Sequence, residues 1–185
     1  RVSAAGGEPI VLTTPDREHG EADHLLPEFL PGGEAVLFTI TSVTGGIATA
    51  QVAVLDLRTR TSKALFRGGT HARYVPSGHL VYAVAGALRA VRFDLGRLEV
   101  VGTPAPVLEG VVTTLLPAAD VAVSANGSLV YIPGGPTGGG QRTVVAVDRQ
   151  GRTTPLPGLP LDAYQAVKVS PDGARLALAT EDDVW

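Results

Sequence analysis

Two histidines and two carboxylates lie within six residues near the start of the chain, at His19, Glu21, Asp23 and His24. Imidazole nitrogens and carboxylate oxygens are ligands that zinc and similar ions accept. The spacing is not the H-E-x-x-H pattern that places two histidines on one face of a helix, and no predicted element holds the four side chains together. We therefore interpret this stretch as a polar loop leading into a strand, and we predict neither a metal site nor a cofactor.

A glycine-rich run at residues 134–140 resembles a phosphate cradle in composition. A phosphate-binding loop needs a lysine followed by serine or threonine at the start of a helix, whereas residues 141–145 read as a strand. The run is interpreted as a hairpin loop. Asn126 begins a formal glycosylation acceptor, but Asn126 and Gly127 form the Asn-Gly pair expected in a turn.

Nucleophilic catalysis finds little support in the sequence. The chain has no cysteine and no G-x-S-x-G motif, and Ser77, Ser124 and Ser170 fall in predicted turns. The glycine-rich loop with its lysine and the H-R-D motif of protein kinases are also absent from the sequence. We therefore predict that this chain carries no enzymatic activity of its own.

One short phrase, with small, turn-forming residues before a glycine, occurs four times. Its glycines are spaced 45, 49 and 46 residues apart. Proline, serine, asparagine and aspartate favour turns, and glycine accepts the positive φ that turns often require. Each glycine is followed by apolar residues at every second position, as expected for a strand with at least one buried face. The four copies are residues 29–33, 74–78, 123–127 and 169–173.

A second pattern recurs behind the first. Residues 51–57, 87–95 and 142–148 each read as a strand that ends at or near an aspartate, and each is followed by a polar turn and a short strand. Four short strands in about 45 residues are typical of a propeller blade. The sequence thus predicts an all-β fold, a β-propeller of four-stranded antiparallel blades with about four blades present.

The predicted blades divide the chain at regular intervals. Residues 1–22 end a cut blade, residues 23–70, 71–118 and 119–163 each form a blade, and residues 164–185 begin another. Two architectures fit this division. The chain is part of a ring of six or more blades, which is the prediction we adopt, or it is a small ring whose last blade is completed by both ends.

Composition excludes several function classes. The 185 residues carry a formal net charge of −3 without a long basic stretch, which argues against a nucleic-acid surface. No segment has the apolar length of a membrane helix, so we expect no membrane contact by this segment. An incomplete ring would leave sheet edges open, and we expect self-association through them.

The repeated phrases resemble a known family. Residues 29–39 and 169–179 are similar to blades of the TolB family of six-bladed propellers. Further segments resemble one subset of that family, the propeller that lies C-terminal to the kinase domain in many bacterial serine/threonine protein kinases. These segments are residues 21–33, 74–83, 91–95 and 101–110.

This resemblance implies a sensor or protein-interaction module in a larger bacterial signalling protein, in an extracytoplasmic location. Two alternatives remain open from the same resemblance: an accessory propeller of a prolyl-oligopeptidase-like hydrolase, and a TolB-type envelope protein.

Binding is expected where the innermost strands line the channel of a propeller. These strands are predicted near residues 24–30, 71–75, 119–124 and 164–169. Acidic and basic groups are mixed there, which suits a hydrated channel or a ligand that is a peptide, a protein or a small molecule. The alternative interpretation is that these residues belong to ordinary blade-entry loops. The polar residues on or beside these strands are His24, Glu28, His71, Arg73, Asp120, Tyr164, Gln165 and Lys168.

Overall fold

The computed structural model describes residues 1–114, 118–124, 126–134, 143–148, 150–160, 164 and 166–179. Within these residues the secondary structure is almost entirely antiparallel β-sheet, with one short 3-10 helix, η1 (Gly46–Thr49). No helix in this part of the chain is long and apolar enough to cross a membrane. The chain divides into two compact units, residues 1–69 and residues 70–185, which are described separately.

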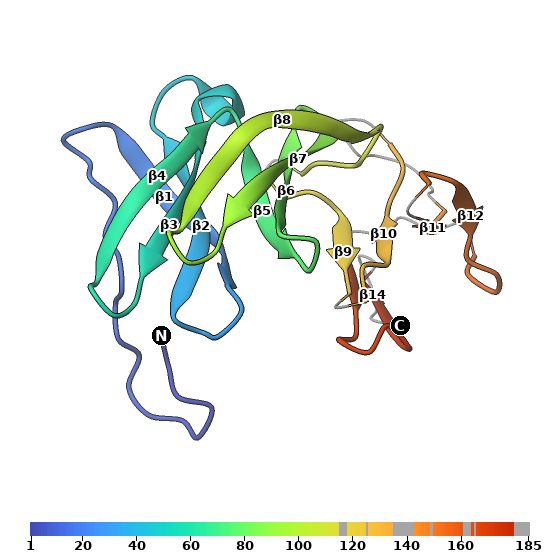
Figure 1. The fold of residues 1–185 in the computed structure, drawn as a ribbon, viewed down its shortest axis with the longest axis horizontal. Helices are drawn as coiled ribbons and strands as arrows, with labels where there is room; N and C mark the ends of the chain where they lie inside the picture. Colours follow the sequence, from blue (N-terminus) through green and yellow to red (C-terminus); the bar gives the residue numbers. More distant parts are fainter. Residues whose placement is uncertain are drawn as a thin grey trace. The chain divides into compact units, whose positions relative to one another are not determined.

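The first unit holds one four-stranded sheet in the order β1-β2-β3-β4 (Figure 1). All neighbouring strands pair antiparallel, so the sheet is a simple meander. The strands are β1 (Glu21–Phe29), β2 (Ala35–Ser42), β3 (Gln51–Asp56) and β4 (Thr61–Arg67). The segment before β1 folds back on itself, because Arg1 and Ile10 exchange two backbone hydrogen bonds of 2.6 and 2.7 Å.

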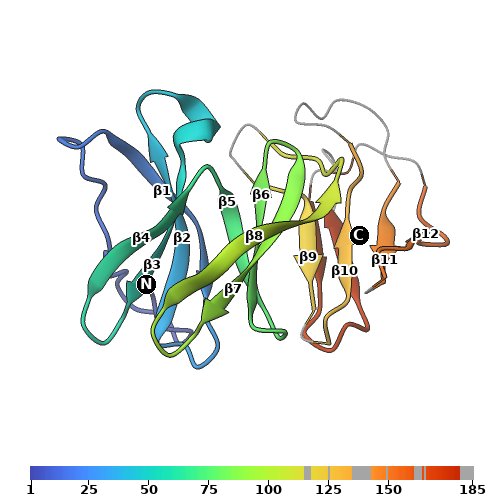
Figure 2. The same cartoon turned by 45° about the horizontal axis from the view of Figure 1, so that its top comes forward.

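The second unit holds two four-stranded meanders and one two-stranded hairpin among its described residues. The meander of β5 to β8 is drawn in green shades in Figure 2, and β9 to β12 follow it along the chain. The strands are β5 (Thr70–Val75), β6 (His79–Val84), β7 (Ala87–Asp94), β8 (Glu99–Glu109), β9 (Val121–Val123), β10 (Leu129–Tyr131), β11 (Val145–Val147), β12 (Thr153–Pro155), β13 (Ala166–Val169) and β14 (Leu176–Ala179).

The repeated phrase forms the corner between the first two strands of every sheet, as the sequence predicts. In each copy the glycine amide donates to the carbonyl three residues earlier, at 2.8 to 3.0 Å. The four glycines all have positive φ, between 69° and 87°. In the third copy the Asn126 side chain also accepts from the Ser128 amide at 3.0 Å, so this asparagine belongs to the turn.

The aspartates at the ends of the third strands close the next turn of the meander. The Asp94 carboxylate accepts from the amides of Gly96 and Arg97, both at 3.0 Å. Asp56 and Asp148 make the same kind of contact with the residues that follow them. These local hydrogen bonds explain why the residue type recurs, because an aspartate side chain satisfies backbone donors that the turn exposes.

Apolar side chains pack between successive sheets within the second unit. One cluster joins the sheet of β5 to β8 to the sheet of β9 to β12, and includes Leu88, Val121 and Tyr131. Another joins the latter sheet to the β13–β14 hairpin and includes Ile132 and Leu178. Stacked antiparallel meanders of this kind are the construction of a β-propeller, and the chain is an all-β segment of that class.

Candidate functional site

A repeated irregularity shapes the innermost strands of the first two sheets. In β1 the pairing with β2 shifts between Leu25 and Glu28, and in β5 the pairing with β6 shifts between Thr70 and Arg73. Each bulge contains a residue other than glycine with positive φ: Leu26 at 56° and His71 at 50°. Both residues lie seven positions before the turn glycine of their sheet. Bulges redirect side chains and are common beside functional sites.

His71 connects two sheets of the second unit. Its Nδ1 atom lies 2.9 Å from the amide nitrogen of Ala119, which donates to it from 48 residues away. Its Nε2 atom lies 3.1 Å from Nη2 of Arg73. The bulge of β5 and the segment preceding β9 are therefore joined through one imidazole ring.

The surroundings of His71 favour its neutral form. Burial is the largest cause, followed by the positive charges of Arg73 and Lys168, and together they lower the pKa of His71 from 6.5 to about 4. A ring with this pKa is uncharged at neutral pH. The effect of Lys168 on His71 also shows that β13 brings its positive charge into the neighbourhood of β5.

Arg73 and Lys168 occupy the same position in their repeats, five residues before the turn glycines Gly78 and Gly173. Arg73 is half-buried in β5, whereas Lys168 is exposed in β13. Asp120 lies directly before β9, at the repeat position of His71, and its exposed fraction is 5%. His71, Arg73, Asp120 and Lys168, all of the second unit, are called the polar cluster below.

Tyr164 and Gln165 are the candidate binding residues that the sequence predicts beside the innermost strand near residues 164–169. Tyr164 is only 1% exposed and packs in the apolar cluster with Ile132 and Leu178, while its hydroxyl donates to the Pro160 carbonyl at 2.7 Å. Its side chain thus contributes to packing in the blade. Gln165 lies outside the described residues.

His24 and Glu28 belong to the first unit, on β1. His24 Nδ1 lies 2.8 Å from the Thr13 hydroxyl and His24 Nε2 lies 3.0 Å from the Glu21 carboxylate. Its ring also contacts Phe38, with centroids 4.9 Å apart. Glu28 is half-buried, opposite Leu37 of β2. His19 pairs instead with Asp16 at 2.7 Å, so the two histidines of this stretch have different partners.

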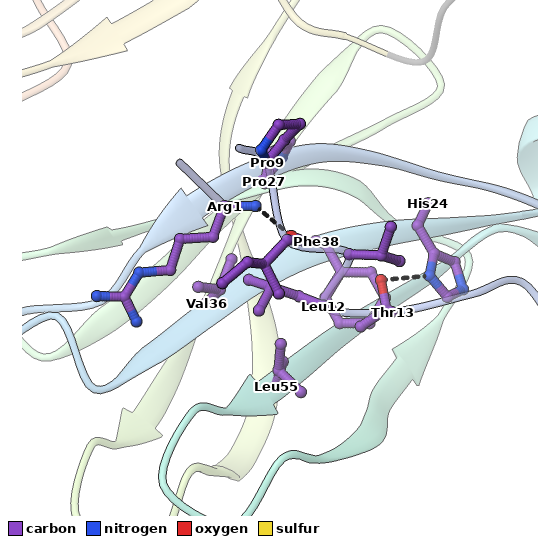
Figure 3. A pocket seen from close by; sticks show the side chains of 11 residues that line it. Arg1, Pro9, Leu12, Thr13, His24, Pro27, Val36, Phe38 and Leu55 are labelled. Atoms are coloured by element: carbon purple, nitrogen blue, oxygen red, sulfur yellow. Dashed lines mark hydrogen bonds between the residues drawn. The ribbon is translucent and has the colours of Figure 1, made fainter. Parts of the chain in front are cut away.

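A pocket of about 430 Å³ lies beside His24, between the N-terminal segment and the sheet of the first unit (Figure 3). Its lining is largely apolar, with Leu12, Val36, Phe38 and Leu55 facing the space. Both nitrogens of His24 are already engaged by Thr13 and Glu21. The pocket offers an apolar surface with few polar contacts to orient a ligand.

The polar cluster is better suited to recognition of a polar ligand. A neutral imidazole, a guanidinium and an ammonium come near one another from β5 and β13, and the Asp120 carboxylate occupies the equivalent repeat position before β9. Charged hydrogen-bond donors such as these bind anionic oxygens strongly. In the described residues, no three histidine, aspartate or glutamate side chains converge as they would around a metal ion.

Sequence reasoning identified the side chains of the polar cluster but missed a backbone group. The amide of Ala119 has no side-chain signature, and only the folded chain places it against His71. The equivalence of His71 with Asp120, and of Arg73 with Lys168, could have been found by counting back from each turn glycine.

Comparisons with solved structures agree with the propeller class. TolB from Acinetobacter baumannii aligns with a TM-score of 0.55 and 23% identity, covering 84% of this chain and 37% of TolB. A puromycin-hydrolysing peptidase from Mycobacterium tuberculosis aligns with a TM-score of 0.65 and 12% identity, covering 84% of this chain and 25% of the peptidase. Regucalcin, a calcium-binding protein from Agrobacterium tumefaciens, aligns with a TM-score of 0.55 and 13% identity, covering 88% of this chain and 55% of regucalcin.

The chain therefore spans between about a quarter and about half of the length of these three proteins. At these identities the similarity shows the propeller fold. No protein-family model matches the chain, and no curated protein matches it.

Proposed function

We propose that this chain is a non-catalytic propeller module that binds a peptide, a protein or a small polar ligand through the polar cluster. The observation that carries the proposal is the bridge from the Ala119 amide through His71 to Arg73. It places a half-buried guanidinium beside a neutral imidazole where three sheets begin. Burial of such groups is costly, and their concentration at one place is characteristic of recognition sites.

The larger protein to which the module would belong is proposed from the sequence resemblance. Similarity of residues 74–83 and 91–95 to kinase-associated propellers supports a sensor in a bacterial signalling protein, with an extracytoplasmic location. The structural similarity to TolB is compatible with a TolB-type envelope role as well.

A second candidate function is favoured by one comparison. Of the structures described above, the puromycin-hydrolysing peptidase has the highest TM-score, 0.65. An accessory propeller that controls access to a separate hydrolase domain would have the same sheets. In that case the polar cluster would contact substrate on its way to the catalytic domain.

Selection from a displayed random-peptide library tests the binding function. The 185-residue chain is immobilised, and peptides are counter-selected on the double variant Arg73→Gln, Lys168→Gln. The double variant Arg92→Gln, Arg175→Gln is the matched control, because both of its arginines are exposed and lie outside the polar cluster. We expect peptides that bind the wild type and the control but not the cluster variant. Peptides that bind all three proteins equally would contradict the proposal.

A further inference from the structure

A second pocket adjoins the pocket beside His24 in the first unit. Its volume is about 690 Å³, and both pockets are lined by the same five residues, Arg1, Ile10, Val11, Leu12 and Leu55. The two pockets together are called the N-terminal groove below. The groove runs between the N-terminal segment and the sheet of β1 to β4, and all of its lining residues belong to the first unit.

The two walls of the N-terminal groove are held in different ways. The sheet wall includes the side chains of Phe38 and Leu55, which belong to the apolar core of the first unit. Within the described part of the chain, residues 1–12 make no backbone hydrogen bond to any strand. Leu12 packs against the two core side chains, and the Thr13 hydroxyl is hydrogen-bonded to a histidine of β1. This wall can therefore move to admit a ligand without breaking the pairing of the sheet.

Large apolar side chains are exposed to solvent along the N-terminal groove. Val2, Ile10, Val11 and Phe29 all line it, and they are 57%, 60%, 80% and 59% exposed. Covering such surface with another apolar group is favourable by about 25 cal/mol for each Å² removed from water. Apolar patches that border a hollow are common at ligand-binding sites. The groove therefore favours a ligand with an apolar body.

Positive charge gathers at one end of the N-terminal groove. Arg1 and Arg60 line the larger pocket, together with the single carboxylate of Glu8. Within the described residues, neither guanidinium has a hydrogen bond or an ion pair. Figure 3 shows Arg1 and His24 at opposite ends of the smaller pocket, and both nitrogens of His24 are already hydrogen-bonded. An anionic group is therefore attracted to the arginine end of the groove.

We propose that the N-terminal groove binds one molecule of an amphiphile that has an apolar tail and a carboxylate head. The tail lies between Leu12 and Phe38, and the head accepts from Arg1 and is attracted by Arg60. Two guanidinium groups and one carboxylate, that of Glu8, leave one excess positive charge at this end, which matches a monoanion. A carboxylate also fits the planar fork of arginine. The inference goes beyond the proposed function, because the polar cluster lies in the second unit.

Nuclear magnetic resonance of the methyl-labelled 185-residue chain tests the inference. The probes are decanoate, butyrate, decanol and decyltrimethylammonium, each below the concentration at which it forms micelles. We expect decanoate to shift the methyl signals of Leu12 and Leu55 saturably, and its tail to show nuclear Overhauser contacts to Phe38. Butyrate should bind at least tenfold more weakly, because it lacks most of the apolar tail. Decyltrimethylammonium should also bind more weakly than decanoate, because its charge is repelled by both arginines.

A variant at the arginine end separates recognition of the head from burial of the tail. Arg60→Gln, at an exposed position, should weaken the binding of decanoate about threefold, because an exposed charge interaction is lost. The same variant should leave the binding of decanol unchanged. Arg17→Gln is the matched control, since Arg17 is an exposed arginine of the first unit that does not line the groove. We expect it to bind both probes as the wild type does.

Several results would overturn the inference. Equal affinity for decanoate and decanol would show that the groove does not recognise the head, and contacts of the tail with other residues would place the site elsewhere. Binding to phosphatidylglycerol vesicles without binding of monomeric decanoate would indicate a membrane surface instead. Changes of the Leu12 and Phe38 signals on dilution of the free protein, matching those that decanoate causes, would show that a second copy of the chain fills the groove. Absence of any response to decanoate would also reject the inference. None of these results bears on the polar cluster, so the proposed function would stand.

Discussion

The backbone at His71 shows how a strand can present a side chain that regular pairing would place elsewhere. A non-glycine residue with φ of 50° costs free energy, and it persists only where surrounding contacts hold it. Here the contact is the Ala119 amide, which bonds to the ring and fixes its direction. The strain and the long-range hydrogen bond therefore belong to the same local arrangement.

Acid should destabilise the protein through His71. Its pKa is about 4 in the folded chain and close to 6.5 when unfolded, so between these values the unfolded state binds a proton that the folded state does not. The contribution of His71 to the free energy of unfolding is therefore fully present above pH 6.5. It is lost as the pH falls toward 4, and the loss is roughly 3 kcal/mol. Urea unfolding at a series of pH values measures this loss.

The variant His71→Asn isolates the contribution of the ring. Asparagine tolerates positive φ, and its side-chain oxygen can accept from the Ala119 amide, but it does not titrate in this range. We expect its stability to fall less steeply with acid than that of the wild type. If the free energy of unfolding depends on pH in the same way in both proteins, His71 is not the titrating group.

The part of the polar cluster that the sequence could predict consists of side chains on inner strands. His71, Arg73 and Lys168 were found because the repeat places them beside a turn of known type. The Ala119 amide could not be predicted, because it depends on the packing of residues 48 positions apart. Tyr164 was selected for its hydroxyl, yet its ring fills an apolar cluster where the hydroxyl bonds locally.

At the scale of the elements, each turn glycine forms the corner between the first and second strands of its sheet. Gly78 has φ of 80°, and a Cβ atom added there would meet no neighbouring atom within 4 Å. The cost of Gly78→Ala should therefore come from the backbone alone, about 1 kcal/mol. Gly78→Asn should cost less, because asparagine tolerates this conformation. Chemical denaturation of both variants is the measurement, and equal losses would contradict the explanation.

The strand β8 is the edge of its sheet and carries features that discourage pairing with another chain. It is 11 residues long and largely exposed, but Pro104 and Pro106 remove two backbone donors from it. Its pairing with β7 is also interrupted by two register shifts. Prolines and bulges at sheet edges limit aggregation in many β proteins.

Replacing these prolines should make the edge competent for pairing. The double variant Pro104→Thr, Pro106→Thr restores two N–H groups within a strand that also exposes Val101 and Val107. We expect faster aggregation, measured by light scattering at constant temperature and protein concentration. The control Thr103→Ser leaves the number of backbone donors unchanged. Identical aggregation rates for the wild type and the double variant would show that the prolines do not protect the β8 edge from pairing with another chain.

At the scale of the whole molecule, the period of the repeated phrase was enough to predict the fold class. Turn residues and alternating apolar positions are local signals, and every blade repeats them. Ring size and the division into blades stay predictions, since they depend on contacts that local patterns do not encode. The sequence also could not show the pocket beside His24, whose walls come from the N-terminal segment and three strands.

Self-association of the chain is expected to involve the apolar surface of its N-terminal segment as well as sheet edges. Val2, Ile10 and Val11 are 57%, 60% and 80% exposed. Val11→Asp should therefore shift the chain toward monomer, as measured by light scattering coupled to size-exclusion chromatography over a range of concentrations. Thr14→Asp adds the same charge at a nearby exposed residue and should have little effect. A strictly monomeric wild type would remove the prediction.

The equivalent positions five residues before each turn glycine hold Glu28, Arg73, Ala122 and Lys168. One of these residues is acidic, one is neutral and two are basic, although the corner that follows each of them is the same. At the three charged positions, the turn glycine and the pairing of the strands, rather than the side chain, maintain the blade, whereas Ala122 is 2% exposed and packs in an apolar cluster. Protein engineers could randomise Glu28, Arg73 and Lys168 together, keep Ala122, and select new binding specificities on a folded scaffold.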